Sequence, residues 1–309
     1  MCGRPRRLRG DRRGLVRRGM RGHCTGISLT HVEGDDVTTS QDTSKQQAHY
    51  NASYGEFRSA LYAEIRREAF GEDIGQQSWI TAEEQDGFIR HLSLGSGRTL
   101  LDIASGAGGP ALRIAATTGC SVVGIDLHEQ AIATSTALAA ERGLSQVAHF
   151  ERANAEQPLP FPNDRFDAIT CIDAINHLPD RVRVIGECAR VLKSGGRLLF
   201  TDPVVVTGPL TSEEIRLRSS IGFFLFVPVD YDEQVIAGCG LRLVSKADTT
   251  AHMAEIAARR EAARAVRRAA LVDIEGQDTF EAQQEFFAVV RKLAMERKLC
   301  RFVYVAERV

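Results

Sequence analysis

A glycine-rich turn lies between two acidic residues near the middle of the chain. The segment LLDIASGAGGPALRIAA carries Asp102 at the end of an apolar run. The pattern G-x-G-x-x-A follows it, at Gly106, Gly108 and Ala111. A glycine loop that opens a helix brings backbone N–H groups close to a ligand. The second acid, Asp126, ends the next apolar run, where a carboxylate can accept hydrogen bonds from both hydroxyls of a ribose.

Asp102 discriminates between two ligands that use such a loop, a nicotinamide dinucleotide and S-adenosylmethionine (SAM). A dinucleotide places a pyrophosphate over the turn, and an unpaired carboxylate nearby would repel it. SAM has no phosphate, and its sulfonium and α-ammonium charges suit a carboxylate that acts directly or through water. None of the tyrosines has Lys four residues on, so the Tyr-x-x-x-Lys pair of some dehydrogenases is missing. The residues favour SAM; the alternative is a carboxylate that only caps the turn's own amides.

Strands and helices alternate around this turn. Strands are predicted in RTLLDI, CSVVGID, AHFERA, RFDAITCI and GRLLFTD, with a helix after most of them. This alternation predicts parallel strands joined by right-handed crossovers, with the ligand at the carboxyl ends of the strands. Two later strands, GLRLVSKADT and RFVYVAERV, complete the set. We therefore expect an α/β fold with a Rossmann-like, doubly wound, mostly parallel sheet of seven strands.

Helical segments flank the predicted sheet. FRSALYAEIRREAFG and TAEEQDGFIRHL, the second with Thr81 and Glu84 as a capping box, predict a helical N-terminal lid. SEEIRLRSSIGFFLF is predicted to be helical. Two long helices, AEIAARREAARAVRRAALV and TFEAQQEFFAVVRKLAMERK, predict a C-terminal helical insertion before the last strand. The Arg-rich face of residues 254–270 is interpreted as a solvated helix face, with nucleic-acid contact as the alternative.

Composition limits the classes of function. The 309 residues carry a net charge of -1, which gives no overall attraction to nucleic acid or acidic lipid. No apolar run approaches the roughly 18 residues that span a bilayer. The seven cysteines form no C-x-x-C pair, which indicates neither a zinc site nor a disulfide framework and is typical of the reducing cytosol. We expect a cytoplasmic monomer or homodimer with a small-molecule partner and without metal, nucleic acid or membrane.

The N-terminal segment differs from the rest of the chain. MCGRPRRLRGDRRGLVRRGMRG is rich in Arg and Gly, and the polar stretch that follows has no periodicity. We interpret residues 1–45 as a disordered tail or a mis-called start, with Val37 as an alternative start. A nucleic-acid-binding arm and an organelle transit segment are the alternatives. One domain over residues 46–309, with its core at 95–205, is then expected.

Four segments resemble, in order and spacing, the motifs of class I SAM-dependent methyltransferases. They are LLDIASGAGGP, VVGIDL, ANAEQPLPFPNDRFDAITCIDAINHLPDR and VLKSGGRLLFTDP. Ala104 departs from the family, which usually has Gly there. AFGEDIGQQSWIT, DAINHL and FTDP further resemble the sarcosine/dimethylglycine and phosphoethanolamine N-methyltransferases. The resemblance implies methyl transfer from SAM to a small molecule, first to an amine nitrogen and second to an oxygen or carbon of a specialised metabolite. A nicotinamide-dependent oxidoreductase and a non-catalytic SAM-binding protein are remote alternatives.

The resemblance also implies roles for single residues. His177 would take or steer a proton from the acceptor together with Tyr50 or Tyr54, and Asp173 would orient His177 or hold a cationic amine. The Asn154 carbonyl would accept from the adenine amino group, or bond its own turn. The residues expected to contact the cofactor are Asp102, Ala104, Ser105, Gly106, Gly108, Asp126, Leu127, Asn154, Ala155, Ile172, Gln77 and Ser78. A histidine at the rim and a plain interhelix loop at residues 76–79 are the structural alternatives.

Overall fold

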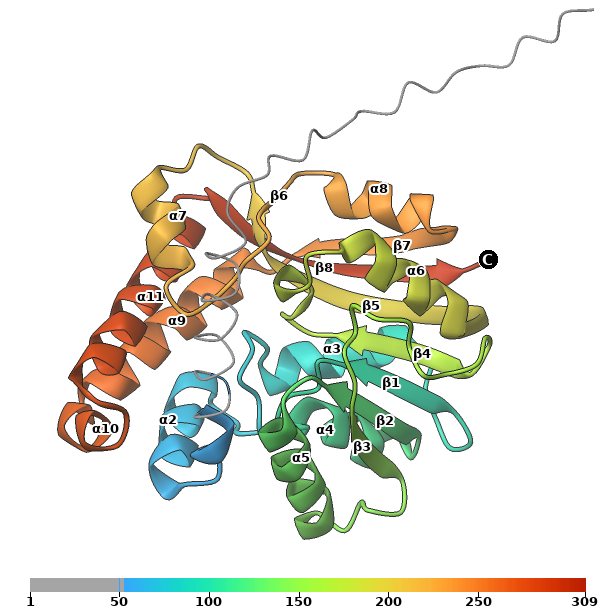
Figure 1. The fold of residues 1–309 in the computed structure, drawn as a ribbon, viewed down its shortest axis with the longest axis horizontal. Coiled ribbons are helices and arrows are strands. Elements are labelled where there is room, and N and C mark those ends of the chain that lie inside the picture. The colour runs from blue at the N-terminus through green and yellow to red at the C-terminus, as the bar shows by residue number, and fades with distance from the viewer. Residues whose placement is uncertain (1–49, 51–52) are drawn as a thin grey trace, which may run out of the picture. The chain divides into compact units, whose positions relative to one another are not determined.

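An eight-stranded sheet forms the centre of the fold (Figure 1). The structure, a computed structural model, describes Tyr50 and residues 53–309, so the predictions for residues 1–45 lie outside the described residues. The strand order is β3-β2-β1-β4-β5-β8-β7, and β6 pairs with β5. The strands are β1 (Thr99–Ile103), β2 (Ser121–Asp126), β3 (Ala148–Arg152), β4 (Phe166–Cys171), β5 (Leu192–Val206), β6 (Val227–Pro228), β7 (Leu241–Asp248) and β8 (Leu299–Arg308).

Strands β1 to β5 are parallel, and β8 runs antiparallel between β5 and β7. Strand β1 lies between β2 and β4, so the order of the sheet reverses there, and ligands of doubly wound sheets bind at this point. The predicted Rossmann-like, mostly parallel sheet is confirmed. The eighth strand, β6, was not predicted, because two residues, one of them a proline, carry no strand periodicity.

Two apolar cores cover the two faces of the sheet. Leu100, Ala168 and Leu199 pack with helices α3 (Ala82–Leu92) and α4 (Gly109–Thr118). Their chain neighbours Leu101, Ile169 and Leu198 face the other way, toward α6 (Arg181–Val191) and α8 (Tyr231–Gly238). Successive strand residues therefore point to opposite faces, as a sheet buried on both sides requires. Helix α5 (Glu129–Glu141) packs on the side of α3 and α4, and the short 3₁₀ turn Ile175–His177 packs on the side of α6 and α8.

A group of helices lies beside the carboxyl ends of the strands (Figure 1). It contains α2 (Ala60–Phe70), α7 (Ser212–Arg218), α9 (Thr250–Ala265), α10 (Arg268–Glu275) and α11 (Gln277–Met295). Phe70 and Trp79 from the N-terminal part pack with Met253, Phe286 and Phe287 from the C-terminal part in one apolar cluster. The predicted lid and the predicted insertion thus share a core, although more than 150 residues separate them in the sequence.

Three local predictions differ from the structure. The long helix expected from residue 254 onward is two helices, because the chain turns at Val266 and Arg267 between α9 and α10. Helix α7 ends at Arg218, and the apolar residues after it form the wall of a cavity instead of continuing the helix. The capping box at Thr81 is half formed, since the backbone N–H of Glu84 donates to the Thr81 hydroxyl while the Glu84 carboxylate pairs with Arg301.

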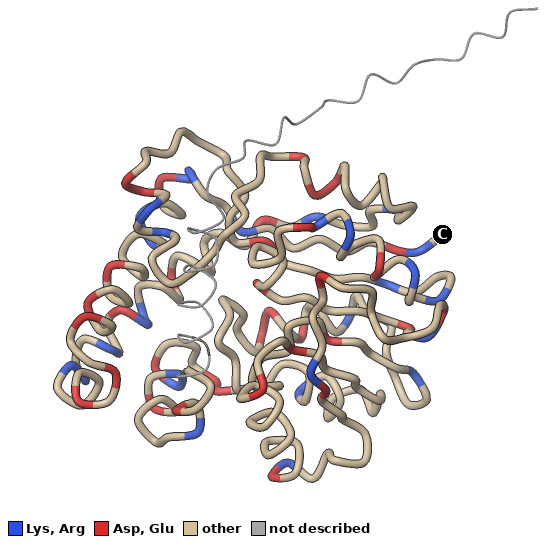
Figure 2. The backbone as a smooth tube through the Cα atoms, viewed as in Figure 1, with Lys and Arg blue, Asp and Glu red and all other residues tan. Residues whose placement is uncertain are grey.

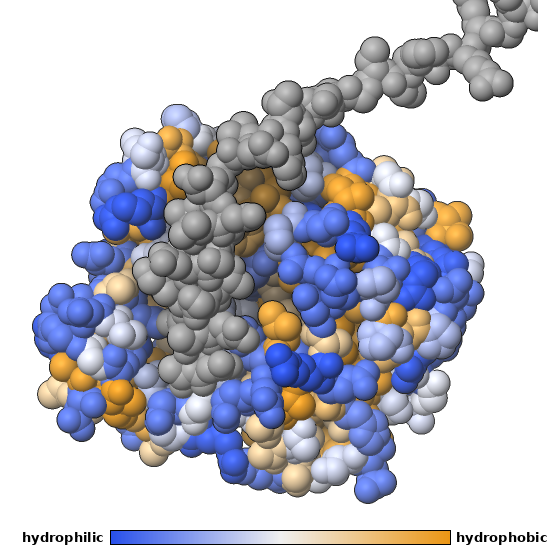
Figure 3. Space-filling view, viewed as in Figure 1, coloured by the Kyte–Doolittle hydropathy of each residue, from blue (hydrophilic) through white to orange (hydrophobic). Residues whose placement is uncertain are grey.

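The surface of the described chain is mixed in charge and polarity. Basic and acidic residues are interspersed over the described part of the chain (Figure 2). Hydrophobic residues form small separate groups among hydrophilic ones on the described part of the face in Figure 3. Among the residues placed by the structure, no helix is long and apolar enough to cross a bilayer. The five cysteines in this part of the chain are free thiols.

Candidate active site

A cavity of about 500 Å³ lies beyond the carboxyl ends of β1, β2 and β4. This volume is within the range of pockets that hold cofactors and drug-sized ligands. Eleven of the twelve predicted cofactor contacts line it: Asp102, Ala104, Ser105, Gly106, Asp126, Leu127, Asn154, Ala155, Ile172, Gln77 and Ser78. The sequence did not single out Gly75, His128, Glu156 or Pro179, which also line this cavity.

The twelfth residue, Gly108, serves packing instead of lining the cavity. It is the N-cap of α4 with φ 79°, and a Cβ there would lie 2.7 Å from the Ser135 Cβ and 2.9 Å from the Phe150 ring. Gly106 also has positive φ (55°), and a Cβ on it would lie 3.2 Å from the Tyr54 hydroxyl. Ala104 adopts φ 54°, a region that L-residues rarely visit, which gives a physical reason for glycine at this position.

Asp102 presents a buried carboxylate to this cavity. Asp102 is 5% exposed, and one of its carboxylate oxygens accepts a 2.6 Å hydrogen bond from the Thr170 hydroxyl. Burial raises the pKa of Asp102 to about 7, the Thr170 bond opposes this, and the nearby Asp126 adds to it. A cationic ligand would restore the charged form at neutral pH. The arrangement fits the sulfonium and ammonium of SAM and not a pyrophosphate.

Asp126 is fixed at the end of β2 by two backbone amides. Its two carboxylate oxygens accept hydrogen bonds of 2.9 Å from the N–H groups of Gly106 and His128. Burial raises the pKa of Asp126, and these two amides oppose the shift. An ionised carboxylate has further lone pairs, so the same side chain can accept two ribose hydroxyls.

Two serine hydroxyls in the first cavity are buried without a hydrogen-bond partner. They belong to Ser78 and Ser105, and unsatisfied buried hydroxyls are uncommon in folded proteins. Asn154 uses its side-chain carbonyl to accept from the Glu156 amide, which is the turn contact considered as the alternative, while still lining the cavity. Gln77 donates to the Ser53 hydroxyl at 2.9 Å. The carboxylates, unused hydroxyls and volume together fit a polar cationic nucleoside.

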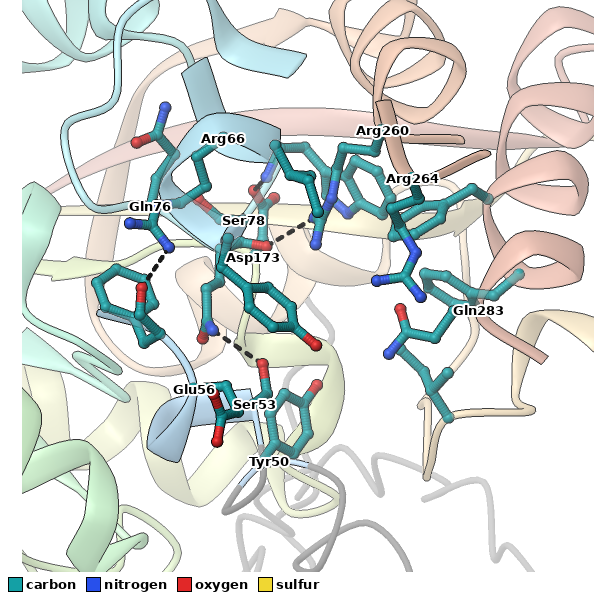
Figure 4. A pocket seen from close by; sticks show the side chains of 18 of the residues that line it. Tyr50, Ser53, Glu56, Arg66, Gln76, Ser78, Asp173, Arg260, Arg264 and Gln283 are labelled. Atoms are coloured by element: carbon teal, nitrogen blue, oxygen red, sulfur yellow. Dashed lines mark hydrogen bonds between the residues drawn. The ribbon is translucent and has the colours of Figure 1, made fainter. Parts of the chain in front are cut away.

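A second cavity, of about 200 Å³, adjoins the first (Figure 4). Helices α2, α7, α9, α10 and α11 and the segments between helices line it, with aromatic rings from Trp79, Phe224, Phe286 and Phe287. Five residues line both cavities: Tyr50, Gln77, Ser78, Asp173 and His177. The two cavities therefore share a boundary, and three of the five residues on it are those predicted to be catalytic.

Tyr50 and His177 are joined at this boundary. The Tyr50 hydroxyl lies 3.1 Å from His177 Nε2, and His177 Nδ1 lies 2.8 Å from the Phe223 carbonyl oxygen. A carbonyl only accepts, so Nδ1 carries the proton and Nε2 accepts from the tyrosine. Burial lowers the pKa of His177 to about 4, against the Phe223 bond, and burial raises the pKa of Tyr50 to about 12. At neutral pH the pair consists of a neutral imidazole and a protonated phenol.

Asp173 is held by groups other than His177. Its carboxylate accepts from Arg301 Nε at 2.8 Å, from the Thr201 hydroxyl at 2.7 Å and from the Trp79 amide at 2.8 Å. Although burial opposes it, Asp173 and Glu84 raise the pKa of Arg301. Asp173 is thus ion-paired with a buried arginine that also pairs with Glu84. The geometry favours a positioning role for Asp173, and direct binding of a cationic amine stays a prediction.

The sequence analysis wrongly predicted that the arginines of the second cavity lie in solvent. The face of residues 254–270 was interpreted as solvated, but Arg264 is buried and Arg260 lies over the Phe287 ring at 4.6 Å. Arg260 also donates to the Gln77 carbonyl at 3.0 Å. The sequence spacing could have predicted that these arginines face inward, because Arg260 and Arg264 follow buried Ile256 at intervals of four residues on one helix.

Part of the chain matches a known protein family and known proteins. Residues 101–200 match the family described as methyltransferase domain. The chain is 32% identical over 183 residues to a 27-O-demethylrifamycin SV methyltransferase of Amycolatopsis mediterranei, covering 56% of this chain and 66% of the relative. It is 34% identical over 133 residues to a sarcosine/dimethylglycine N-methyltransferase of Halorhodospira halochloris, covering 43% and 47%. The chain thus spans less than two thirds of the length of these relatives.

The fold has counterparts among solved structures. The cyclopropane synthase MmaA2 of Mycobacterium tuberculosis superimposes with a TM-score of 0.73 at 19% identity, over 85% of this chain and 98% of that one. At this identity the likeness concerns the fold. The matching domain and the curated relatives show that residues 101–200 of this chain carry a SAM-dependent methyltransferase domain.

Proposed function

We propose that the protein transfers the methyl group of SAM to a small molecule in the second cavity, with an amine nitrogen as the acceptor. The observation that carries this proposal is the shared boundary of the two cavities at Tyr50 and His177. SAM supplies a methyl group on a cationic sulfur, which is an activated donor. In this proposal Asp102, Asp126 and the turn at Ser105 bind the cofactor in the first cavity.

The chain's main contribution is alignment and exclusion of water. Methyl transfer needs the acceptor atom in line with the methyl group, and fixing that geometry supplies much of the rate. Trp79, Phe224 and Phe286 are each at most 8% exposed and wall the acceptor side. A cavity of about 200 Å³ limits the acceptor to a small metabolite, because drug-sized ligands occupy pockets of roughly 300–1,000 Å³.

The electrostatics of the cavity support a neutral amine. Arg218 and Arg260 line it, and a second positive charge beside them would be unfavourable, so a bound ammonium tends to lose its proton. The neutral amine is the nucleophilic form. In the reaction a nitrogen–carbon bond forms, the carbon–sulfur bond breaks, and S-adenosylhomocysteine leaves. The proton of the amine passes to His177 Nε2 directly or through the Tyr50 hydroxyl.

A hydroxyl acceptor is the second candidate, and the Tyr50–His177 pair favours it. A hydroxyl must lose its proton as the oxygen–carbon bond forms. His177 Nε2 is unprotonated and accepts from Tyr50, so a proton from the acceptor can replace the one that Tyr50 donates. The similarity to the 27-O-demethylrifamycin SV methyltransferase is consistent with this candidate.

Calorimetry and product analysis test the proposal together. We expect SAM and S-adenosylhomocysteine to bind and NADH not to bind, with Asp126→Ala abolishing both interactions. A panel of paired acceptors, such as benzylamine and benzyl alcohol, is then incubated with SAM and examined by mass spectrometry for a gain of one CH₂. Absence of S-adenosylhomocysteine binding, or a preference for NADH, would refute the proposal. Methylation of only the alcohols would select the second candidate.

Location and assembly remain predictions. The sequence predicts a cytoplasmic protein that is a monomer or a homodimer and that binds no nucleic acid. Sedimentation of the purified chain measures the assembly state, and cell fractionation measures the location.

A further inference from the structure

The second cavity contains a buried arginine whose two terminal nitrogens bind nothing. Arg218 is 1% exposed, and neither Nη1 nor Nη2 has a hydrogen-bond partner. It ends helix α7 and lines the cavity. Burying an unpaired guanidinium costs several kcal/mol, so folded proteins normally provide it with a partner. Such a group in a cavity wall points to a ligand that completes it.

Aromatic rings hold this guanidinium in place without satisfying its N–H groups. The Arg218 guanidinium carbon lies 4.2 Å from the Phe224 ring centroid and 4.9 Å from that of Phe286. Stacking of this kind orients the planar group and leaves its edge available. Burial lowers the pKa of Arg218 to about 10, so the side chain is still charged at neutral pH.

A second unpaired side chain lines the same cavity. Asn176 is fully buried, and both its amide nitrogen and its carbonyl oxygen are without a partner. The Ser78 hydroxyl at the boundary is also unpaired. Three side chains that line this one cavity therefore have unsatisfied polar atoms, and buried polar groups normally have partners. These side chains form a polar surface on which Arg218 can donate hydrogen bonds and Asn176 can both donate and accept them.

None of the three carboxylates that line the cavity bonds to Arg218. Asp173 is bound by Arg301, Glu275 is bound by Arg264 and by the Tyr62 hydroxyl, and the third, Glu56, is exposed. The Arg218 end of the cavity is therefore positive, and its complement is an anion. The forked pair of N–H groups on a guanidinium matches the two oxygens of a carboxylate.

We propose that the methyl acceptor is a small carboxylic acid whose carboxylate binds Arg218, with Asn176 beside it, while its nucleophile lies at Tyr50 and His177. This inference rests on the proposed methyl transfer. The geometry allows one small molecule to reach both ends, because Arg218 and His177 contact the same ring. The Phe224 ring centroid lies 4.5 Å from the His177 ring centroid and 4.2 Å from the Arg218 guanidinium carbon. The imidazole and the guanidinium are therefore both in contact with one ring, and a small molecule can span the distance between them.

The test uses benzoate and its neutral analogue benzamide on the full-length protein saturated with S-adenosylhomocysteine. We expect calorimetry to show at least tenfold tighter binding of benzoate. Arg218→Met should remove this preference while leaving the affinity for S-adenosylhomocysteine within about threefold, since Arg218 does not line the first cavity. Arg216→Gln is the matched control, because Arg216 lies on the same helix, is exposed and pairs with Glu213.

Each result separates the two proposals. Equal binding of benzoate and benzamide, or a preference that survives in Arg218→Met, overturns the carboxylate site even when S-adenosylhomocysteine binds normally. Tighter binding of inorganic phosphate than of benzoate overturns the choice of carboxylate. Failure of S-adenosylhomocysteine to bind overturns the proposed function, and the benzoate titration then proceeds without it. If Arg218→Met does not fold, Arg218→Lys keeps the charge without the fork and should lose most of the preference.

Discussion

Replacement of Asp102 by Asn should stabilise the free protein and weaken its binding of SAM. Burial raises the pKa of Asp102 from its ordinary 3.8 to about 7. A carboxyl group whose folded pKa is raised binds its proton more tightly in the folded state. The protonated carboxyl group therefore contributes stability that is present in full below pH 3.8 and is lost as the pH rises through 7. At pH 8 the charged carboxylate therefore destabilises the free protein.

The size of this effect follows from the shift. Three pKa units correspond to about 4 kcal/mol, which is the largest gain in unfolding free energy that Asp102→Asn can give at pH 8. The asparagine carbonyl can still accept from the Thr170 hydroxyl, so that bond is kept. The gain should be small at pH 4, grow between pH 4 and 7, and stay constant above it. SAM loses its charged partner, and we expect its affinity to fall about 10- to 100-fold.

Urea unfolding at several pH values and calorimetry with SAM measure the two effects. Asp167→Asn is a matched control of opposite sign. Burial alone would raise the pKa of Asp167, but hydrogen bonds from Lys193, Arg98 and the Thr99 amide lower it, so its loss should destabilise the protein at pH 8. Equal stability of wild type and Asp102→Asn at pH 8, or an unchanged affinity for SAM, would refute the reasoning.

Three further predictions concern packing, a buried ion pair and proton transfer. Gly108→Ala should lower the unfolding free energy by about 1–3 kcal/mol in thermal denaturation, and Gly119→Ala should cost less, because both have positive φ but only the first Cβ would clash. Arg301→Met leaves two buried carboxylates unpaired and should cost about 3–5 kcal/mol in urea unfolding, whereas Arg242→Met breaks an exposed pair and should cost less than about 1 kcal/mol. His177→Gln should slow methylation of a hydroxyl about 10²- to 10⁴-fold and of an amine much less, and equal losses for both acceptors would contradict its role as a base.

The sheet and the cofactor side of the site could be predicted from the sequence because their signals are local. Alternating strands and helices fix the order of a doubly wound sheet, and a ligand at its switch point then meets the ends of known strands. Asp102 and Asp126 lie at the carboxyl ends of β1 and β2, and His177 lies in the short turn after β4, so their place at one edge of the sheet required only the topology. Gly108 was assigned to the ligand because a glycine pattern does not distinguish contact with a ligand from contact with the Phe150 ring.

The arginines of the acceptor side could not be predicted, because this side is assembled from segments far apart in the chain. Arg218 and Arg260 come from different parts of the sequence and meet only through packing of the helical layer, whereas Tyr50 was predicted from the family resemblance. An arginine on an amphipathic helix usually lies in solvent, so burial against aromatic rings overrides the prior expectation. The partner of Asp173 was missed for the same reason, since Arg301 is 128 residues away in the sequence.

Several residues at which local rules fail line the two cavities. Ala104 has positive φ, Asp102 is a buried carboxylate, and Ser78, Asn176 and Arg218 have unsatisfied polar atoms. Each feature lowers the stability of the free protein, and the Thr170 hydrogen bond offsets only part of the effect at Asp102. Ligands that bind only the folded state would recover this free energy. The protein should therefore be stabilised more by cofactor and acid together than by either alone, because the two ligands satisfy different groups of one rigid site.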